Sequence, residues 1–136
     1  MKTRTHFLAF CVLAFIVSCQ QTAPIETSIS KKGLIKVTIL YPNGEGKTFD
    51  MEYYANKHMP MVAELFRDSL KLWEVDKGIA GRSPEEPAPY LAMGYLYFEK
   101  LSTFQNAMGV HRDTILNDIP NYTNIQPILQ FSEVIE

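Results

Sequence analysis

The sequence contains only two cysteines, Cys11 and Cys19, and both lie close to its amino terminus. Residues 1–18 combine a basic start with an apolar run of signal-peptide length, and small residues precede Cys19. Cleavage before Cys19 would remove Cys11 and leave Cys19 to carry lipid. The mature chain would then keep no free thiol for a disulfide, a nucleophile or a metal site.

Residues 1–18 resemble the signal peptide of bacterial lipoproteins. The apolar run from Phe7 to Val17 is too short for a comfortable transmembrane helix, although an uncleaved membrane anchor is the alternative interpretation. The resemblance implies export to the bacterial cell envelope and attachment to the membrane through lipidated Cys19. Residues 19–33 are polar and lack periodicity, so we predict a flexible tether there.

Basic residues are not in excess, with 13 Lys and Arg against 15 Asp and Glu. Loss of Lys2 and Arg4 with the signal peptide makes the mature chain more acidic. The sequence therefore offers no electrostatic footprint for nucleic acid. The three histidines form no cluster with one another or with carboxylates at helical spacing, so we predict no metal site and no cofactor.

Residues 34–136 have the length of one two-layer domain. Runs rich in β-branched and aromatic residues predict strands at 34–41, 70–79, 90–98 and 125–135. Apolar residues at helical spacing predict helices at 50–66 and from 102 to just before Pro120. The order is β-α-β-β-α-β, a ferredoxin-like α+β fold whose antiparallel sheet carries both helices on one face.

Local signals refine this fold. Asp50 is suited to cap the first helix, and Ser102–Gln105 has the form of a capping box at the start of the second. The strand at 90–98 is apolar on both faces, so a bare second face of the sheet would expose a large apolar patch. We therefore expect an isologous homodimer that pairs two sheets face to face.

His58 is the most informative single residue. It lies on the apolar face of the first predicted helix with Tyr54 and Val62, so its imidazole points towards the core. An inward histidine is more often a hydrogen-bonded core residue than a catalyst. Pro60 cannot donate to the carbonyl of Asn56, however, so the helix is expected to kink or restart just after His58 and to open space beside the ring.

Several segments of residues 34–136 resemble the EthD family of the dimeric α/β-barrel superfamily. The segments that carry the resemblance are Lys36–Pro42, Tyr53–Pro60, Ala88–Tyr90 and Asp118–Pro127. The family's tyrosine, histidine and proline signature maps onto Tyr54, His58 and Pro60. The resemblance implies a ferredoxin-like subunit paired into a β-barrel dimer, with a pocket between sheet and helices. The lipoprotein-like leader departs from the family pattern, whose members are commonly cytoplasmic.

A ferredoxin-like fold does not by itself name a reaction, so the function must be argued from the site. Our first hypothesis is a cofactor-free enzyme, oxygenase-like or isomerase-like, that acts on a small aromatic or cyclic hydrophobic compound. His58 would be the general acid or base, and Tyr54 would stabilise an enolate-like oxygen. The second is an envelope lipoprotein that binds a hydrophobic small molecule or haem without reaction. The candidate binding residues are His111, Tyr90, Tyr122 and Asn121.

Overall fold

The computed structural model describes residues 30–136. Its helices and strands are β1 (Ile35–Pro42), α1 (Met51–Tyr53), α2 (Met59–Phe66), β2 (Leu72–Lys77), β3 (Tyr90–Phe98), α3 (Leu101–Asp118) and β4 (Ile128–Glu133). A π-helical turn, Tyr54–His58, joins α1 to α2, and 3₁₀ turns follow α2 and α3. The predicted signal peptide, the predicted lipidation site Cys19 and most of the predicted tether lie outside the described residues.

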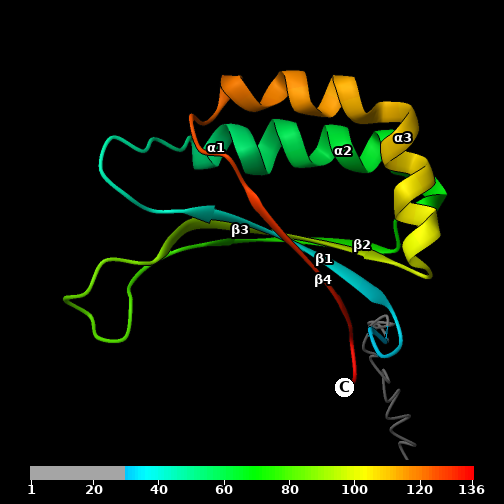
Figure 1. Cartoon of the computed structure of the whole chain (residues 1–136), viewed down its shortest axis with the longest axis horizontal. Coiled ribbons are helices and arrows are strands. Elements are labelled where there is room, and N and C mark those ends of the chain that lie inside the picture. Colours follow the sequence, from blue (N-terminus) through cyan, green and yellow to red (C-terminus); the bar gives the residue numbers. More distant parts are fainter. Residues whose placement is uncertain (1–29) are drawn as a thin grey trace, which may run out of the picture.

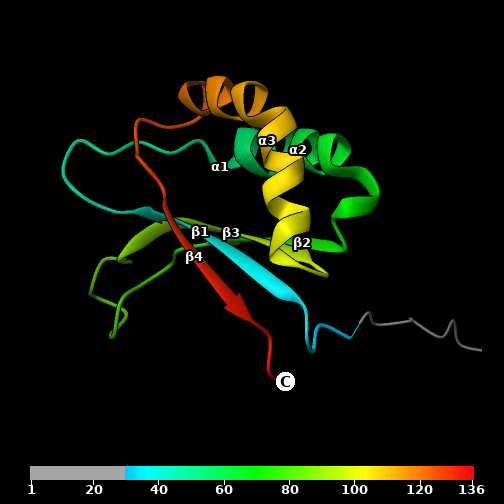
Figure 2. The same ribbon diagram turned by 45° about the vertical axis from the view of Figure 1, so that its right-hand side comes forward.

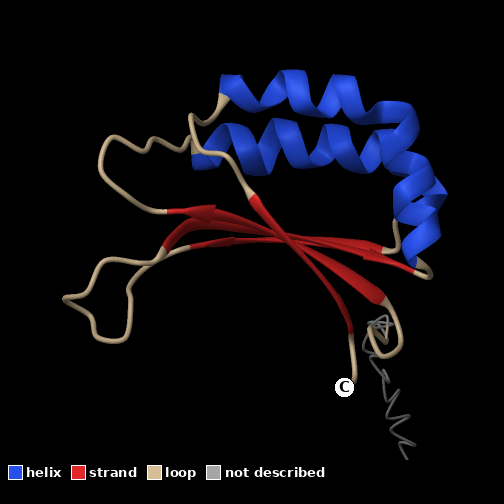
Figure 3. Ribbon diagram, viewed as in Figure 1, coloured by secondary structure: helices blue, strands red, loops and turns tan. Residues whose placement is uncertain are grey.

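The four strands form one antiparallel sheet in the order β2-β3-β1-β4. Figures 1 and 3 show that the helices lie on a single face of this sheet, and the turned view in Figure 2 agrees. The prediction of a ferredoxin-like α+β fold with a β-α-β-β-α-β order is therefore confirmed. Within residues 30–136, no helix combines the length and the hydropathy needed to span a bilayer.

The core lies between the helices and one face of the sheet. Alternate residues of β1 and β3 point to this face, and Val37 is paired with Leu96 in the register of the two strands. The helices contribute Val62, Phe66 and Phe104, all at most 9 % exposed. Burial of each such side chain contributes about 1.5–3 kcal/mol, so the helices are held mainly by this apolar contact.

The opposite face of the sheet carries a mixture of side chains. Leu40 of β1 is paired with Met93 of β3 and with Ile128 of β4, so three apolar residues form one row across the sheet. The neighbouring rows are polar, and in one of them the Glu74 carboxylate accepts hydrogen bonds from Lys31 and Tyr97. This face is less apolar than the sequence of β3 alone suggests. Outside the apolar row, the residues that flank β3 on this face belong to rows that are largely polar.

Of two local features predicted for the helices, one is wrong and one is present. The capping box at Ser102–Gln105 is wrong, because α3 begins at Leu101 and its N-cap is Lys100, which makes no side-chain capping bond. Ser102 therefore already lies in the first helical turn. The helix restarts just after His58, as predicted from Pro60, because the π turn ends at His58 and α2 begins at Met59. His58 and Met59 both keep helical backbone angles, so the chain stays helical across this junction. The helix widens into the π turn directly before the proline.

Candidate functional site

The π turn places two aromatic rings in the core. Asp50 caps α1 as predicted, because its side chain accepts a hydrogen bond from the Tyr53 backbone N–H. The Met59 N–H then donates to the carbonyl of Tyr54, five residues back. Tyr54 is fully buried and His58 is 4 % exposed. Single π turns within helices occur frequently at functional sites.

His58 is fixed by the end of the other long helix. Its Nδ1 lies 2.8 Å from Oδ2 of Asp118, the last residue of α3. The second carboxylate oxygen, Oδ1, accepts hydrogen bonds from the Tyr53 hydroxyl at 2.9 Å and from the Asn121 amide at 2.8 Å. Three donors on two oxygens hold the carboxylate in one orientation, which in turn orients the imidazole.

The protonation states follow from these contacts. Burial alone would raise the pKa of Asp118, but hydrogen bonds from His58, Asn121 and Tyr53 bring the pKa below its usual range. Burial lowers the pKa of His58, against the opposing effect of Asp118. At neutral pH the pair is therefore a carboxylate and a neutral imidazole. Nδ1–H donates to Asp118, which leaves the lone pair on Nε2.

Nε2 faces a pair of buried phenols. The Tyr122 hydroxyl lies 3.4 Å from Nε2 and 2.8 Å from the Tyr41 hydroxyl. Burial raises the pKa of both tyrosines, so both stay protonated at neutral pH. A hydrogen-bonded chain thus runs from Asp118 through His58 and Tyr122 to Tyr41. Such a chain can accept a proton at one end without placing an isolated charge in the core.

Tyr54 lies against this chain without joining it. Its ring stacks on the His58 ring with centroids 5.6 Å apart and an angle of 17° between the planes. Its hydroxyl has no hydrogen-bond partner among the described residues and packs against Gly94 of β3. An unpaired buried hydroxyl is unusual and costs about 1–3 kcal/mol. Burial raises the pKa of Tyr54 far above its ordinary value.

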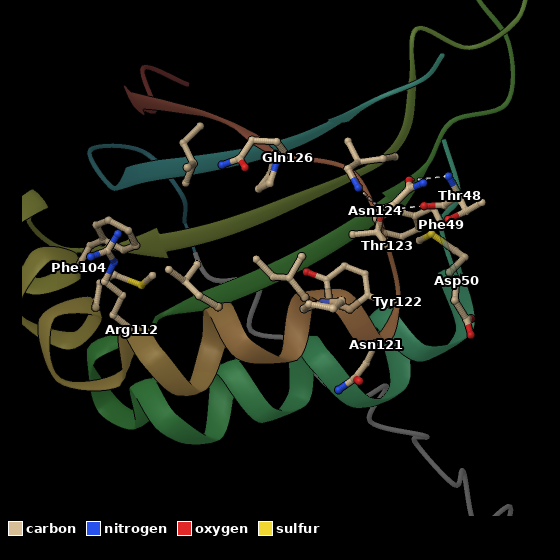
Figure 4. Close-up of a pocket in the computed structure, with 18 of the residues that line it drawn as sticks. Thr48, Phe49, Asp50, Phe104, Arg112, Asn121, Tyr122, Thr123, Asn124 and Gln126 are labelled. Atoms are coloured by element: carbon tan, nitrogen blue, oxygen red, sulfur yellow. Dashed lines mark hydrogen bonds between the residues drawn. The ribbon is translucent and has the colours of Figure 1, made fainter. Parts of the chain in front are cut away.

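A cavity of about 80 Å³ lies beside the imidazole, between the helices and the sheet. His58 and Tyr41 supply its polar groups, and the remaining lining is apolar. An open cleft of about 1330 Å³ lies next to it, between α3 and β4 (Figure 4). Residues that line both spaces are Phe104, Met108, Leu116, Ile119, Pro127 and Leu129. Side chains of this shared wall, together with Tyr122, separate the imidazole from the cleft.

The candidate residues named from the sequence are only partly brought together. Tyr122 and Asn121 contact the His58 and Asp118 pair directly. His111 lies instead beside Phe66, with ring centroids 6.5 Å apart, and Tyr90 begins β3 opposite Pro42. Neither of these two residues lines the cavity or the cleft.

Sequence reasoning did not assign a role to Asp118, Tyr41 or Tyr53. The signal for Asp118 was its position at the end of a helix, directly before Ile-Pro, but nothing in the sequence paired it with His58. Among residues 30–136, no three His, Cys, Asp or Glu side chains gather where they could hold a metal ion.

Comparison with known proteins agrees with this fold. Residues 43–126 match the EthD domain. A solved EthD-like protein from Ralstonia eutropha JMP134 is 41 % identical, with a TM-score of 0.74, over 77 % of this chain and 95 % of that one. An ethyl tert-butyl ether D (EthD) family protein from Bacillus halodurans C-125 is 19 % identical, with a TM-score of 0.52, over 74 % and 97 %.

No match is found among curated proteins. The domain is a ferredoxin-like α+β fold with a buried histidine, carboxylate and tyrosine cluster beside an apolar cavity. The chain belongs to the EthD family.

Proposed function

We propose that this protein is a cofactor-free enzyme that acts on a small aromatic or cyclic hydrophobic compound, with His58 as the general base and acid. The observation that carries the proposal is the neutral imidazole, whose Nδ1 is held by Asp118 and whose ring lines an apolar cavity. A general base of this kind needs a free lone pair within hydrogen-bond reach of the substrate and a partner that stabilises its protonated form.

The proposed step is proton abstraction next to a carbonyl or phenolic oxygen. With the Tyr122 hydroxyl donating to Tyr41 and not to His58, the lone pair on Nε2 of His58 is free to take the proton. Asp118 stabilises the imidazolium, and negative charge develops on the substrate oxygen. Tyr54 is proposed to stabilise that oxygen, because its ring stacks on the ring of His58 and its hydroxyl has no partner among the described residues. Return of the proton to another atom gives isomerisation, and reaction of the carbanion with dioxygen gives oxygenation.

The size of the cavity constrains how such a compound binds. An engineered cavity of about 150 Å³ is large enough for benzene, so a cavity of about 80 Å³ is too small for an aromatic ring as it stands. The shared wall contains Met108, a flexible side chain, and Leu116 and Leu129, which are 38 % and 50 % exposed. Movement of these side chains would join the cavity to the cleft and admit a ring.

Deuterium exchange tests the proton transfer without knowledge of the natural substrate. The purified domain is incubated in D₂O with β-tetralone, a small bicyclic ketone with acidic hydrogens, and label is followed by mass spectrometry. Wild-type protein is expected to accelerate exchange, and His58→Gln to lose about a hundredfold or more of that acceleration.

His111→Gln is the matched control, because it removes the other inward histidine, which does not line the cavity. The control should exchange at the wild-type rate. Equal rates in wild type and His58→Gln, or no acceleration by wild type over buffer across a panel of cyclic ketones and phenols, would exclude the proposed base.

The second candidate function is binding without reaction. Its support is the mostly apolar lining of the cavity, together with a leader sequence that resembles those of lipoproteins. In this case the protein sequesters a hydrophobic small molecule, or haem, at the cell envelope. Native mass spectrometry of the freshly purified protein separates the two functions, because a binder retains an unaltered compound and a catalyst converts it. Titration with haem and a search for its absorption band tests the haem variant.

Attachment through lipidated Cys19 and homodimer formation belong to the same proposal. The lipoprotein-like pattern of residues 1–19 supports export and anchoring in the bacterial envelope, and Cys19→Ala should release the protein from membranes. The homodimer is supported by the uncovered sheet face and by the dimeric superfamily that the sequence resembles.

A further inference from the structure

We infer that the cleft between α3 and β4 binds amphipathic carboxylates, with the acid group at Arg112 and the apolar body extending towards the cavity beside His58. This inference names the substrate class of the proposed enzyme. It rests on the proposed function only where it assumes that the bound acid reacts. Binding of the acid does not require that any reaction occur.

The first argument is the apolar surface of the cleft. Leu116, Leu129 and Phe131 line it and are 38 %, 50 % and 42 % exposed. Three large apolar side chains that gather in one concave surface are suited to an apolar ligand, because binding removes their remaining exposed area from water. Phe104 packs edge-on against Phe131, with ring centroids 5.4 Å apart, and gives the wall a rigid aromatic part.

The second argument is the distribution of charge. Among the described residues that line the cleft, Arg112 is the single cation and Asp50 the single acid. Arg112 forms no ion pair with any other described residue, so its guanidinium is available to a ligand. Figure 4 shows Arg112 beside Phe104 at one end of the cleft, and Asp50 at the other end. The charges therefore favour one orientation of an anionic ligand.

The third argument is distance. Arg112 and Asp118 are six residues apart on α3, or about 9 Å along the helix axis. Asp118 holds His58, and the shared wall between cleft and cavity lies along the same stretch of α3 through Leu116. A carboxylate at Arg112 thus leaves room for several carbon atoms before the ligand reaches the imidazole. Guanidinium groups bind planar carboxylates with two parallel hydrogen bonds, which favours an acid over a neutral head group.

The test uses two probes that differ only in the head group, phenylhexanoate and phenylhexanol, with binding measured by isothermal titration calorimetry. Wild-type protein is expected to bind the acid more tightly than the alcohol. Arg112→Gln should lower the affinity for phenylhexanoate by about three- to tenfold and leave the affinity for phenylhexanol unchanged. The expected effect is of this size because an exposed charge-assisted hydrogen bond contributes modestly to binding.

Arg82→Gln is the matched control, since Arg82 is an exposed arginine outside the cleft and its loss changes the net charge equally. It should leave both affinities unchanged. Leu116→Trp places a bulkier side chain in the wall that the cleft shares with the cavity and should weaken binding of both probes. Circular dichroism of each variant checks that the fold is kept.

The inference is wrong if neither probe binds wild type, if acid and alcohol bind equally, or if Arg112→Gln and Arg82→Gln weaken the acid to the same extent. The two assays separate this inference from the proposed function, because β-tetralone carries no acid group and binding of phenylhexanoate requires no proton transfer. Loss of exchange in His58→Gln together with weaker binding of phenylhexanoate by Arg112→Gln supports both, whereas retained exchange in His58→Gln rejects the base and leaves the anion site standing.

Discussion

His58 titrates in a setting that disfavours its charged form. Tyr54 stacks on its ring, Tyr122 faces Nε2, and Asp118 is the only charged group in direct contact with it among the described residues. Because burial outweighs Asp118, the pKa of His58 in the folded protein lies below its ordinary value of about 6.5. The unfolded chain therefore takes up a proton at a higher pH than the folded protein does.

The sign of the resulting pH dependence follows. The stability that the neutral His58 contributes is complete above about pH 6.5 and is lost as the pH falls towards the lower pKa of the folded state. We expect urea denaturation to show a falling free energy of unfolding between about pH 7.5 and about pH 5, with a smaller fall in His58→Gln. His111→Gln is the control. An identical pH dependence in wild type and His58→Gln would contradict the depressed pKa.

The lowered pKa of His58 also predicts the pH range of catalysis. A general base must be neutral, so exchange of β-tetralone should persist below about pH 6.5 and fall only as the pH passes through the lower pKa of His58. Asp118→Asn removes the contact that raises the pKa of His58 and stabilises the imidazolium. The variant should therefore exchange more slowly at every pH.

Gly94 and Tyr54 form a second residue-scale unit. A Cβ at position 94 would overlap the Tyr54 hydroxyl, whereas the next nearest ring atom, Cζ, would lie at an ordinary 3.4 Å. Gly94→Ala should lower the free energy of unfolding by about 1–3 kcal/mol, because the fully buried ring has no room to move. Tyr54→Phe removes the obstructing atom, so the double variant should recover most of this loss. Chemical denaturation of the four proteins measures the coupling.

We expect Tyr54→Phe alone to keep or raise the stability of the protein but to lower its activity. Loss of an unpaired buried hydroxyl should leave stability unchanged or raise it by about 1 kcal/mol. If Tyr54 stabilises the substrate oxygen as proposed, the same variant loses turnover. A variant that is both destabilised and fully active would contradict the assignment, since it would show that the hydroxyl serves the fold instead.

At the scale of elements, the π turn explains how Pro60 fits into a helix. A proline cannot donate to the carbonyl four residues back, and its ring clashes with that carbonyl in an α-helix. Widening of the preceding turn relieves this conflict, and it also turns both Tyr54 and His58 into the core. The helical period predicted that His58 is buried, but a shift to five-residue spacing leaves no mark in the pattern of apolar residues.

The pairing of His58 with Asp118 also belongs to this scale. The two residues are 60 positions apart and meet only because the π turn and the end of α3 lie next to each other on the sheet. Apolar spacing predicts which face of a helix is buried, but not which end of one helix lies beside which part of another. For this reason the sequence identified His58 and Tyr122 as candidates, but it did not identify Asp118 as the carboxylate that orients His58.

Helix α3 contains a testable weak point, Gly109. This residue is exposed, has no atom within 4 Å of an added Cβ, and lies in the interior of an 18-residue helix. Gly109→Ala should raise the free energy of unfolding by about 0.5–1 kcal/mol, because alanine loses less backbone entropy in a helix. The variant is also a control for Gly94→Ala, since the same substitution should have the opposite effect at the two positions. A destabilised Gly109→Ala would mean that α3 has a contact at this position that the structure does not contain.

At the scale of the whole molecule, the fold was predictable because each strand and helix has its own local signal. Turn-forming residues at 42–46 and prolines at 84, 87 and 89 separate elements whose apolar periods differ clearly. The order of the elements then leaves few ways to cover the sheet. The composition of the second sheet face was not predictable in this way, because it depends on side chains from three or four strands at once.

That second face leads to the last prediction. Leu40, Met93 and Ile128 form one apolar row across it, and Ile128 is 50 % exposed. If two sheets pair face to face, this row lies in the interface, and Met93→Lys places a charge in its apolar part, beside Asp76 of β2. Sedimentation velocity of residues 30–136 should give a dimer for wild type and a monomer for Met93→Lys.

Val110→Lys is the control for this prediction, because Val110 is 77 % exposed on α3. This variant should stay dimeric. A wild-type monomer at all accessible concentrations, or a Met93→Lys dimer as stable as wild type, would place any self-association on a different surface.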